Sequence, residues 1–336
     1  MPLALWALTI SAFAIGTTEF VIVGLIPTIA EQLSITLPSA GMLVSIYALG
    51  VAVGAPVLTA LTGKLPRKQL LMGLMVLFTA GNLVAWLAPN YETLVIARLL
   101  TGLAHGVFFS VGSTIATSLV SKEKAASAIA IMFGGLTVAL VTGVPLGTLI
   151  GQHFGWRESF LAVSLLGVIA LVSSMILVPR NIAQPPVTTL AQQARVMVNP
   201  RLLLIYSITA LGYGGVFTAF TFLAPMMQSL AGFSPSAVSV ILLGYGISVA
   251  IGNIWGGKLA DRRGAVPALT LIFAALAVLL LLFQFTASSH YMALVTVLVM
   301  GIFAFANVPG LQVYVVQKAE SYAPGAVDVA SGLNIA

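Results

Sequence analysis

The chain has 336 residues, of which 60% are hydrophobic and 7% charged, whereas a soluble globular domain carries roughly 25% charged residues. Its 14 basic and 8 acidic side chains are too few to cover a soluble core of this size, which excludes an ordinary soluble enzyme. The basic residues punctuate apolar runs and form no single patch, so the net charge of +6 does not indicate a nucleic-acid partner. Cysteine is absent, which excludes disulfides and cysteine-ligated metals.

Ten apolar runs are long enough to cross a bilayer, since a transmembrane helix needs about 20 mostly apolar residues. The first run lacks a basic leading segment, so we interpret it as a helix and not as a cleaved signal. An eleventh run begins near Val327 and has about ten residues up to Ala336, too few to cross. The predicted spans are residues 3–26, 39–62, 70–88, 93–119, 125–150, 160–178, 202–229, 236–256, 266–285 and 291–315.

The loops between these runs predict the orientation, because Lys and Arg concentrate in cytoplasmic loops. With the N-terminus inside, twelve of the fourteen basic residues fall on the cytoplasmic side. Arg157 lies in an outer loop, and Arg98 falls inside the fourth span. We therefore expect a multi-pass membrane protein with a cytoplasmic N-terminus.

An internal repeat recurs at an offset of about 195 residues. GLIP ends the first run at Pro27 and FLAP ends the seventh at Pro225, and in both halves the next run opens with PSA and closes with GKL. We predict an all-α membrane fold of two six-helix halves, with residues 1–178 as the first half, 179–201 as a cytoplasmic linker and 202–336 as the second. The repeat leads us to expect ten complete spans, with most of helix 11 and all of helix 12 missing.

The loop after the eighth span reads GGKLADRRG and resembles the loop signature of the major facilitator superfamily. The matching residues are Gly257, Leu259, Asp261, Arg262 and Gly264. The resemblance implies that the Asp and Arg clamp the cytoplasmic ends of neighbouring helices. The first-half copy, GKLPRK, keeps the Gly, the Leu and the basic residues but lacks the Asp.

A second motif, GVPLGTLIG in the fifth span, places Gly143, Gly147 and Gly151 four residues apart around Pro145. Small residues at this spacing allow two helices to approach closely, and a proline kinks or stiffens a helix. The motif resembles that of the superfamily's antiporters, which implies a hinge or seal. Together with TTEFVIVGLIP and GLAHG, it resembles the drug and sugar efflux branch and implies an alternating-access transporter of the bacterial inner membrane.

Glu19 is the one acidic residue within the ten predicted spans. A carboxylate there costs on the order of 2.5 to 3.5 kcal/mol on insertion scales, so it is tolerated where it faces a cavity or a partner. Burial disfavours the ionised carboxylate and a nearby guanidinium favours it, so Glu19 is our candidate proton carrier and Arg98 its counterpart. The alternatives are a structural carboxyl bonded to hydroxyls and an Arg98 that extends to the outer interface.

His105 lies seven residues after Arg98 on the same helix and is a candidate proton relay, since histidine titrates near neutral pH. A neutral histidine that bonds a neighbouring helix is the alternative. No acidic or histidine cluster accompanies it within the spans, so we expect no metal site. Candidate cavity residues, each of which could instead be a helix contact, are Asn82, Tyr213, Phe217, Tyr245, Asn253 and Asn307.

The sequence thus predicts a monomeric secondary transporter, not an enzyme, that exchanges protons for a small organic molecule, a drug or a sugar. A uniporter or proton symporter on the same fold is the alternative. The segment GNIWGGK resembles the start of a phosphate-binding loop, but Leu259 replaces the required Ser or Thr and no strand precedes it. We expect no cofactor; the proton gradient supplies the energy.

Overall fold

The computed structural model describes residues 2–182, 195–322 and 326–336, apart from a few side chains within the helices. Every element in these ranges is helical, and ten of the described helices are long and apolar enough to cross a membrane. The predicted all-α membrane fold is confirmed. The elements are α1 (Leu3–Gln32), α2 (Leu37–Val53), η1 (Gly54–Leu58), α3 (Thr59–Thr62), α4 (Arg67–Trp86), α5 (Tyr91–Ser118), η2 (Lys122–Lys124), α6 (Ala125–Val138), η3 (Ala139–Gly143), α7 (Val144–Phe154), α8 (Trp156–Leu177), α10 (Pro200–Ser229), α11 (Pro235–Arg263), α12 (Ala265–Thr286), α13 (His290–Ala304), α14 (Asn307–Tyr322) and α15 (Val327–Ile335).

Two spans contain a π-helical turn next to a proline. η1 interrupts the second span at Pro56, and η3 interrupts the fifth span just before Pro145. A proline lacks the backbone N–H and its ring clashes with the carbonyl four residues earlier, so the regular hydrogen-bond pattern cannot continue there. Both spans therefore depart from the regular α-helical hydrogen-bond pattern at these turns.

The tenth span is divided between α13 and α14 at Phe305 and Ala306, although the sequence predicts one run there. Pro309 explains the break, because its ring occupies the space that the Phe305 carbonyl would need in a continuous helix. The side chain of Asn307 donates to the carbonyl of Ala304 (2.9 Å) and so provides one of the interrupted backbone groups with a partner.

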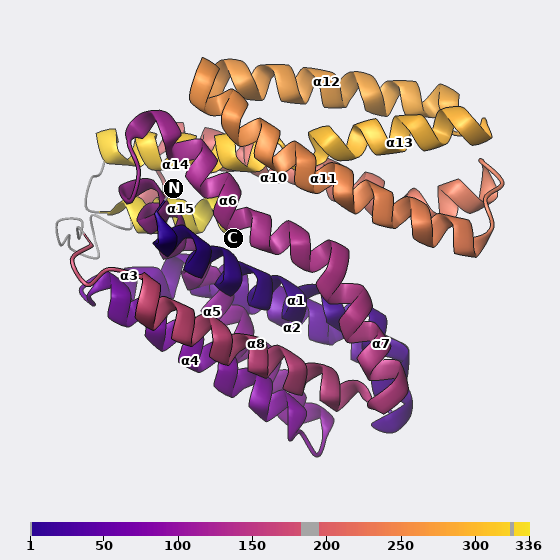
Figure 1. The fold of residues 1–336 in the computed structure, drawn as a ribbon, viewed down its shortest axis with the longest axis horizontal. Helices are drawn as coiled ribbons and strands as arrows, with labels where there is room; N and C mark the ends of the chain where they lie inside the picture. Colours follow the sequence, from indigo (N-terminus) through magenta and orange to yellow (C-terminus); the bar gives the residue numbers. More distant parts are fainter. Residues whose placement is uncertain (1, 183–194, 323–325) are drawn as a thin grey trace.

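The helices form two bundles that converge at one end and spread at the other (Figure 1). The first bundle contains α1 to α8, and the second contains α10 to α14, with α15 packed between α14 and α5. Most of the predicted linker, residues 179–201, lies outside the described residues, which omit 183–194.

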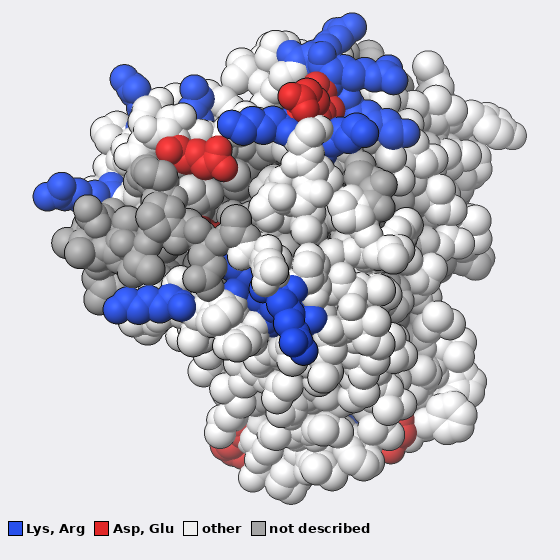
Figure 2. Space-filling model, turned by 60° about the vertical axis from the view of Figure 1, so that its left-hand side comes forward, with Lys and Arg blue, Asp and Glu red and all other residues white. Residues whose placement is uncertain are grey.

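Basic side chains gather at the end where the bundles converge, which we call the basic end (Figure 2). This end carries the α3–α4, α5–α6 and α11–α12 junctions, with Lys64, Lys68, Lys122, Lys124 and Arg263 among the residues there. Between the two ends the outer surface is apolar: Leu211 is 78% exposed and Phe285 76%. An exterior of this kind is stable only where hydrocarbon replaces water.

Candidate functional site

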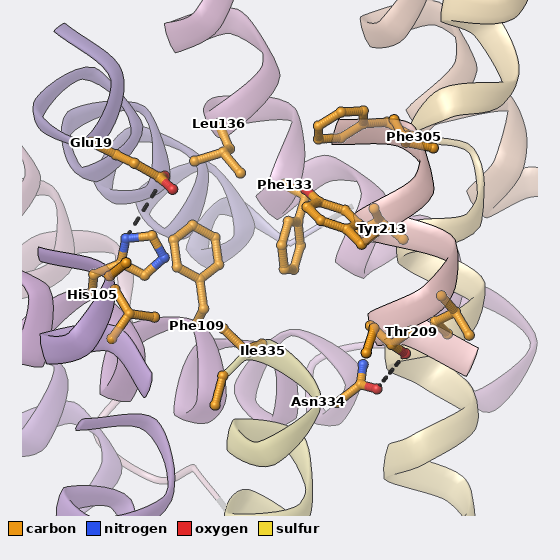
Figure 3. A pocket seen from close by; sticks show the side chains of 18 of the residues that line it. Glu19, His105, Phe109, Phe133, Leu136, Thr209, Tyr213, Phe305, Asn334 and Ile335 are labelled. Carbon is orange, nitrogen blue, oxygen red and sulfur yellow. Dashed lines mark hydrogen bonds and ion pairs between the residues drawn. The ribbon is translucent and has the colours of Figure 1, made fainter. Parts of the chain in front are cut away.

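A cavity of about 800 Å³ lies between the two bundles. Its volume falls in the range of roughly 300 to 1,000 Å³ that small-molecule sites occupy. Aromatic rings form much of the wall, and polar groups lie on opposite sides: Glu19 and His105 on the first bundle, Thr209 and Asn334 on the other (Figure 3). The arrangement suits an organic molecule with an apolar body and polar ends.

Glu19 projects from the middle of α1 into this cavity, where its side chain remains 29% exposed. Its Oε2 atom lies 3.9 Å from Nδ1 of His105 and has no hydrogen-bond partner among the described residues. The same Nδ1 atom shares a 2.8 Å hydrogen bond with the hydroxyl of Tyr47. Glu19 therefore lies beside the hydrogen-bonded pair of Tyr47 from α2 and His105 from α5, but its Oε2 atom forms no hydrogen bond with either residue.

Arg98 is 1% exposed, so it does not extend to the interface. Its Nη1 atom donates to the carbonyl of Thr18 (2.8 Å), and its guanidinium lies 4.1 Å from the centre of the Tyr47 ring. Its Nη2 atom is buried without a hydrogen-bond partner in the described structure. In this conformation the Glu19 carboxyl lies 3.9 Å from His105 and forms no ion pair with Arg98 among the described contacts.

The three predicted proton-coupling residues are thus connected through one residue that the sequence analysis missed. Tyr47 touches Arg98 with its ring and His105 with its hydroxyl. Its only signal in the sequence is a tyrosine within an apolar run, which is equally typical of a residue at a lipid interface.

The predicted cavity residues divide into two groups. Tyr213, Tyr245 and Asn307 line the cavity. Asn82 does not, because it is buried between helices, accepts from Thr18 Oγ1 (2.6 Å) and donates to Phe78 O (2.8 Å).

Asn253 likewise packs between bundles and donates to the Ala130 carbonyl (2.8 Å), so it is not part of the cavity wall. The side chain of Phe217 lies outside the described residues. An asparagine in an apolar run looks the same in the sequence whether its side chain faces a ligand or a neighbouring backbone. The sequence therefore could not distinguish cavity residues from helix contacts.

The three glycines of GVPLGTLIG pack against α1. Gly143 faces Thr17, Gly147 faces Val21 and Gly151 faces Leu25, each so closely that a Cβ atom would overlap the opposing side chain. The four-residue spacing is matched on both helices, which is how small residues bring two helices together. Pro145 lies on an exposed part of the same helix and does not contribute to this contact face. The structure shows the packing role of this motif, and a hinge role stays a prediction.

The motif that the sequence places in a loop forms the last turns of α11 and joins the two bundles at the basic end. The Asp261 carboxylate accepts from the backbone N–H groups of Ala126 (2.8 Å) and Ser127 (3.0 Å) in the first turn of α6. These groups have no partner within their own helix, and the positive end of the helix dipole favours an anion there. Gly257 packs on the same turn, Leu259 lies half-buried beside it, and Arg262 is exposed. Gly264 ends α11 with a φ of 83°, which favours glycine.

The glycines of GNIWGGK also pack on a neighbouring backbone. Gly252 contacts Ile302 and Gly256 contacts Ala306, both without room for a Cβ atom. Gly257, the third glycine, packs on α6, so close contacts between helices account for the glycines of the apparent phosphate-binding motif.

Comparison with known proteins identifies the family. The family model described as Major Facilitator Superfamily matches residues 8–334. The inner membrane transport protein YdhP of Escherichia coli (strain K12) is 43% identical over 335 residues, which cover 98% of this chain and 84% of that protein. The chloramphenicol resistance protein of Streptomyces lividans is 37% identical over 268 residues, which cover 79% of this chain and 68% of that protein.

The fold has a counterpart among solved structures. A crystal structure of the fucose:proton symporter FucP of Escherichia coli superposes with a TM-score of 0.76, covering 98% of this chain and 87% of that one. The two sequences are 14% identical, so this likeness concerns the arrangement of helices alone.

Proposed function

This chain belongs to the major facilitator superfamily, and we propose that it is a proton-coupled antiporter that exports a small organic molecule, a drug or a sugar. As a family member it is a multi-pass membrane transporter. We place it in the bacterial inner membrane as a monomer, with its N-terminus and basic end in the cytoplasm, because cytoplasmic loops are the ones enriched in Lys and Arg.

The observation that carries the proposal is the unpartnered carboxyl oxygen of Glu19. A buried polar atom without a hydrogen bond costs roughly 1 to 3 kcal/mol, so a retained one needs a reason. Here the oxygen faces a cavity, with His105 beside it. A carboxyl in such a place takes up a proton, or releases it when a cargo molecule or a cation replaces the proton.

The closed end of the cavity supports an alternating-access cycle. Each of the ten spans runs between the two ends, and the described hydrogen bonds between bundles involve residues on the basic-end side of the cavity, such as Asp261, Asn253 and Ser110. The basic end, which we propose faces the cytoplasm, is therefore closed in this conformation. Here cargo leaves and Glu19 takes up an external proton; after the bundles rock, new cargo enters from the cytoplasm as the proton departs.

The wall of the cavity supports an aromatic or otherwise largely apolar cargo. Phe109, Phe133, Tyr213 and Phe305 present their rings to it (Figure 3). Rings of this kind bind flat apolar groups by stacking, and a single carboxyl favours neutral or cationic molecules over anions. The Streptomyces lividans relative, by its name, confers resistance to chloramphenicol, which makes that compound a rational first probe.

The test is proton release on adding ligand to the purified full-length protein in weakly buffered detergent solution, followed with a pH indicator. Chloramphenicol and L-fucose are the probes. We expect chloramphenicol to release about one proton per protein, because Glu19 carries one. Glu19→Gln, which cannot ionise, abolishes the release, whereas Glu31→Gln at the exposed end of the same helix leaves it intact.

The other outcomes identify the alternatives. Proton uptake together with either probe indicates a symporter. If a probe binds wild type and Glu19→Gln equally well and neither protein releases or takes up a proton, the result contradicts coupling through Glu19 and indicates a uniporter.

A further inference from the structure

A second connection between the bundles lies at the basic end, between α4 and α15. Arg67, at the start of α4, forms an ion pair with Asp328, the second residue of α15, at 2.5 Å between Nη1 and Oδ2. Both side chains are less than 10% exposed. Removing one partner of such a pair leaves the other charge buried and uncompensated.

The internal repeat shows how this pair relates to Asp261. Aligning the two GKL segments places Arg67 at the position of Asp261. The Asp261 carboxylate accepts hydrogen bonds from N–H groups in the first turn of α6, whereas the Arg67 guanidinium forms an ion pair with a carboxylate in the first turn of α15. The two connections occupy corresponding positions, but their charges are exchanged: Asp261 places an anion against the N-terminal turn of α6, whereas Arg67 places a cation against an anion in the N-terminal turn of α15.

Asp328 also begins a buried polar stripe on α15. Ser331 and Asn334 follow it at intervals of three residues and so lie on one side of the helix. Thr114 donates to Asp328 Oδ1 (2.7 Å), and Ser331 donates to the carbonyl of Ser110 (2.9 Å). Through these bonds the stripe binds α15 to α5 of the first bundle.

The stripe continues into the cavity through bonds within the second bundle. Gln312 donates to Ser331 Oγ (2.6 Å), Asn334 donates to Gln312 Oε1 (2.8 Å), and Thr209 donates to Asn334 Oδ1 (2.7 Å). Thr209, Gln312 and Asn334 all line the cavity. These bonds lead from the cavity wall to Ser331, which bonds Ser110 of the first bundle, and the Ser110 hydroxyl in turn donates to the backbone carbonyl of Asp328, the acidic member of the ion pair.

We propose that Arg67, Asp328 and the polar stripe of α15 form a second cytoplasmic closure, whose strength depends on what the cavity holds. A molecule that draws Gln312 or Asn334 into its own hydrogen bonds takes a partner from Ser331 and weakens the hold of α15 on α5. The inference rests on the alternating-access function proposed above, and it assigns positioning roles to residues outside the proton site.

The test measures opening of the basic end directly. Since the chain contains no cysteine, Ala210→Cys, at an exposed position in the cavity, gives a single labelling site. A membrane-impermeant maleimide is added to inside-out vesicles. The parent is expected to label slowly, and Arg67→Asp, which sets two carboxylates together, to label at least five-fold faster. Asp328→Ser, which removes the ion pair, is expected to label several-fold faster.

The decisive variant combines Arg67→Asp with Asp328→Ser. In this variant the new carboxylate at position 67 faces the free N–H groups at the start of α15, and position 328 carries a small side chain. This is the arrangement of Asp261 at the start of α6. Labelling is expected to return to within about two-fold of the parent. Labelling of the double variant as fast as the faster single variant overturns the exchanged-polarity closure.

Two further variants complete the test. Lys64→Asp makes the same charge change at an exposed position of the same end and is expected to label like the parent. Thr209→Val removes the bond at the far end of the series and is expected to double the labelling rate. A rate unchanged by Thr209→Val overturns the coupling to the cavity. Labelling from the opposite side, in right-side-out vesicles, verifies that each variant is folded. Because the readout needs neither proton nor ligand, its result is independent of the antiport assignment.

Discussion

Arg98 illustrates how a single charged side chain is held inside the bundle. The guanidinium reaches the carbonyls of Thr18 on α1 and Leu43 on α2, and it lies over the ring of Tyr47. These contacts stabilise the buried charge: Nε and Nη1 donate to carbonyls and the face of the guanidinium lies over a ring, while Nη2 has no hydrogen-bond partner among the described residues. Arg98 therefore ties three helices together immediately beside the proposed proton carrier.

Replacing Arg98 with alanine is expected to destabilise the protein. The change removes charge-assisted hydrogen bonds, each contributing roughly 1.5 to 3 kcal/mol, and leaves buried carbonyls unpaired. We expect a loss of about 3 kcal/mol, seen as a lower midpoint of thermal unfolding in detergent. Arg180→Ala, at an exposed position, is the control and is expected to leave the midpoint unchanged. Equal midpoints for the two variants would contradict the anchoring role.

At the scale of elements, α6 lies directly against α1, and two adjacent glycines in α6 differ sharply in their surroundings. A Cβ atom on Gly135 would overlap the carbonyl of Thr9 in α1, whereas one on Gly134 would meet nothing within 4 Å. The close approach is reinforced by Thr9, which donates to the Ile131 carbonyl (2.9 Å).

Alanine at each of these two glycines should therefore have opposite effects. Gly135→Ala is expected to cost about 1 to 3 kcal/mol because it forces α1 and α6 apart. Gly134→Ala is expected to gain up to about 1 kcal/mol from the higher helix propensity of alanine. Thermal unfolding of the two variants side by side measures the difference. Similar midpoints would argue against backbone contact between α1 and α6.

Hydropathy predicts the helices well and their contacts poorly. All ten spans are found near their predicted positions, and α15 begins at Val327 as expected. Length and apolarity suffice for this because the bilayer imposes both. The break before Asn307, in contrast, depends on one proline within an otherwise continuous apolar run.

Some site residues can also be identified from composition, whereas others become apparent only from the tertiary fold. An acid within a span is conspicuous, so Glu19 is readily selected. Asp328 is not, because it lies in a run too short to be read as a span, and its partner Arg67 resembles any cytoplasmic base. Pairing between residues 261 positions apart depends on the tertiary fold, which neither periodicity nor composition encodes locally.

At the scale of the whole molecule, the two bundles also meet beside the cavity, at Val141 of η3 and Gly246 of α11. A Cβ atom placed on Gly246 lies 3.8 Å from that of Val141. This equals the mean separation of about 3.8 Å in disulfides. Cysteines at these two positions would therefore link the bundles directly.

The double variant Val141→Cys with Gly246→Cys is expected to crosslink on mild oxidation and to lose transport. The link fixes the bundles in the conformation described here and prevents rocking. Reduction is expected to restore transport, and either single cysteine serves as the control since the chain has none of its own. Full activity of the crosslinked protein would contradict a rocking cycle at this contact.

The proposed antiport has an electrical consequence, because Glu19 is the one side-chain carboxyl among the described residues that line the cavity. In the proposed cycle Glu19 carries one proton inward, so exporting a neutral molecule moves one net positive charge into the cell, whereas exporting a monovalent cation moves none. An elementary charge that crosses 100 mV contributes about 2.3 kcal/mol. An inside-negative voltage therefore drives export of neutral molecules and leaves export of cations unaffected, so the response to an imposed voltage reports the charge of the cargo.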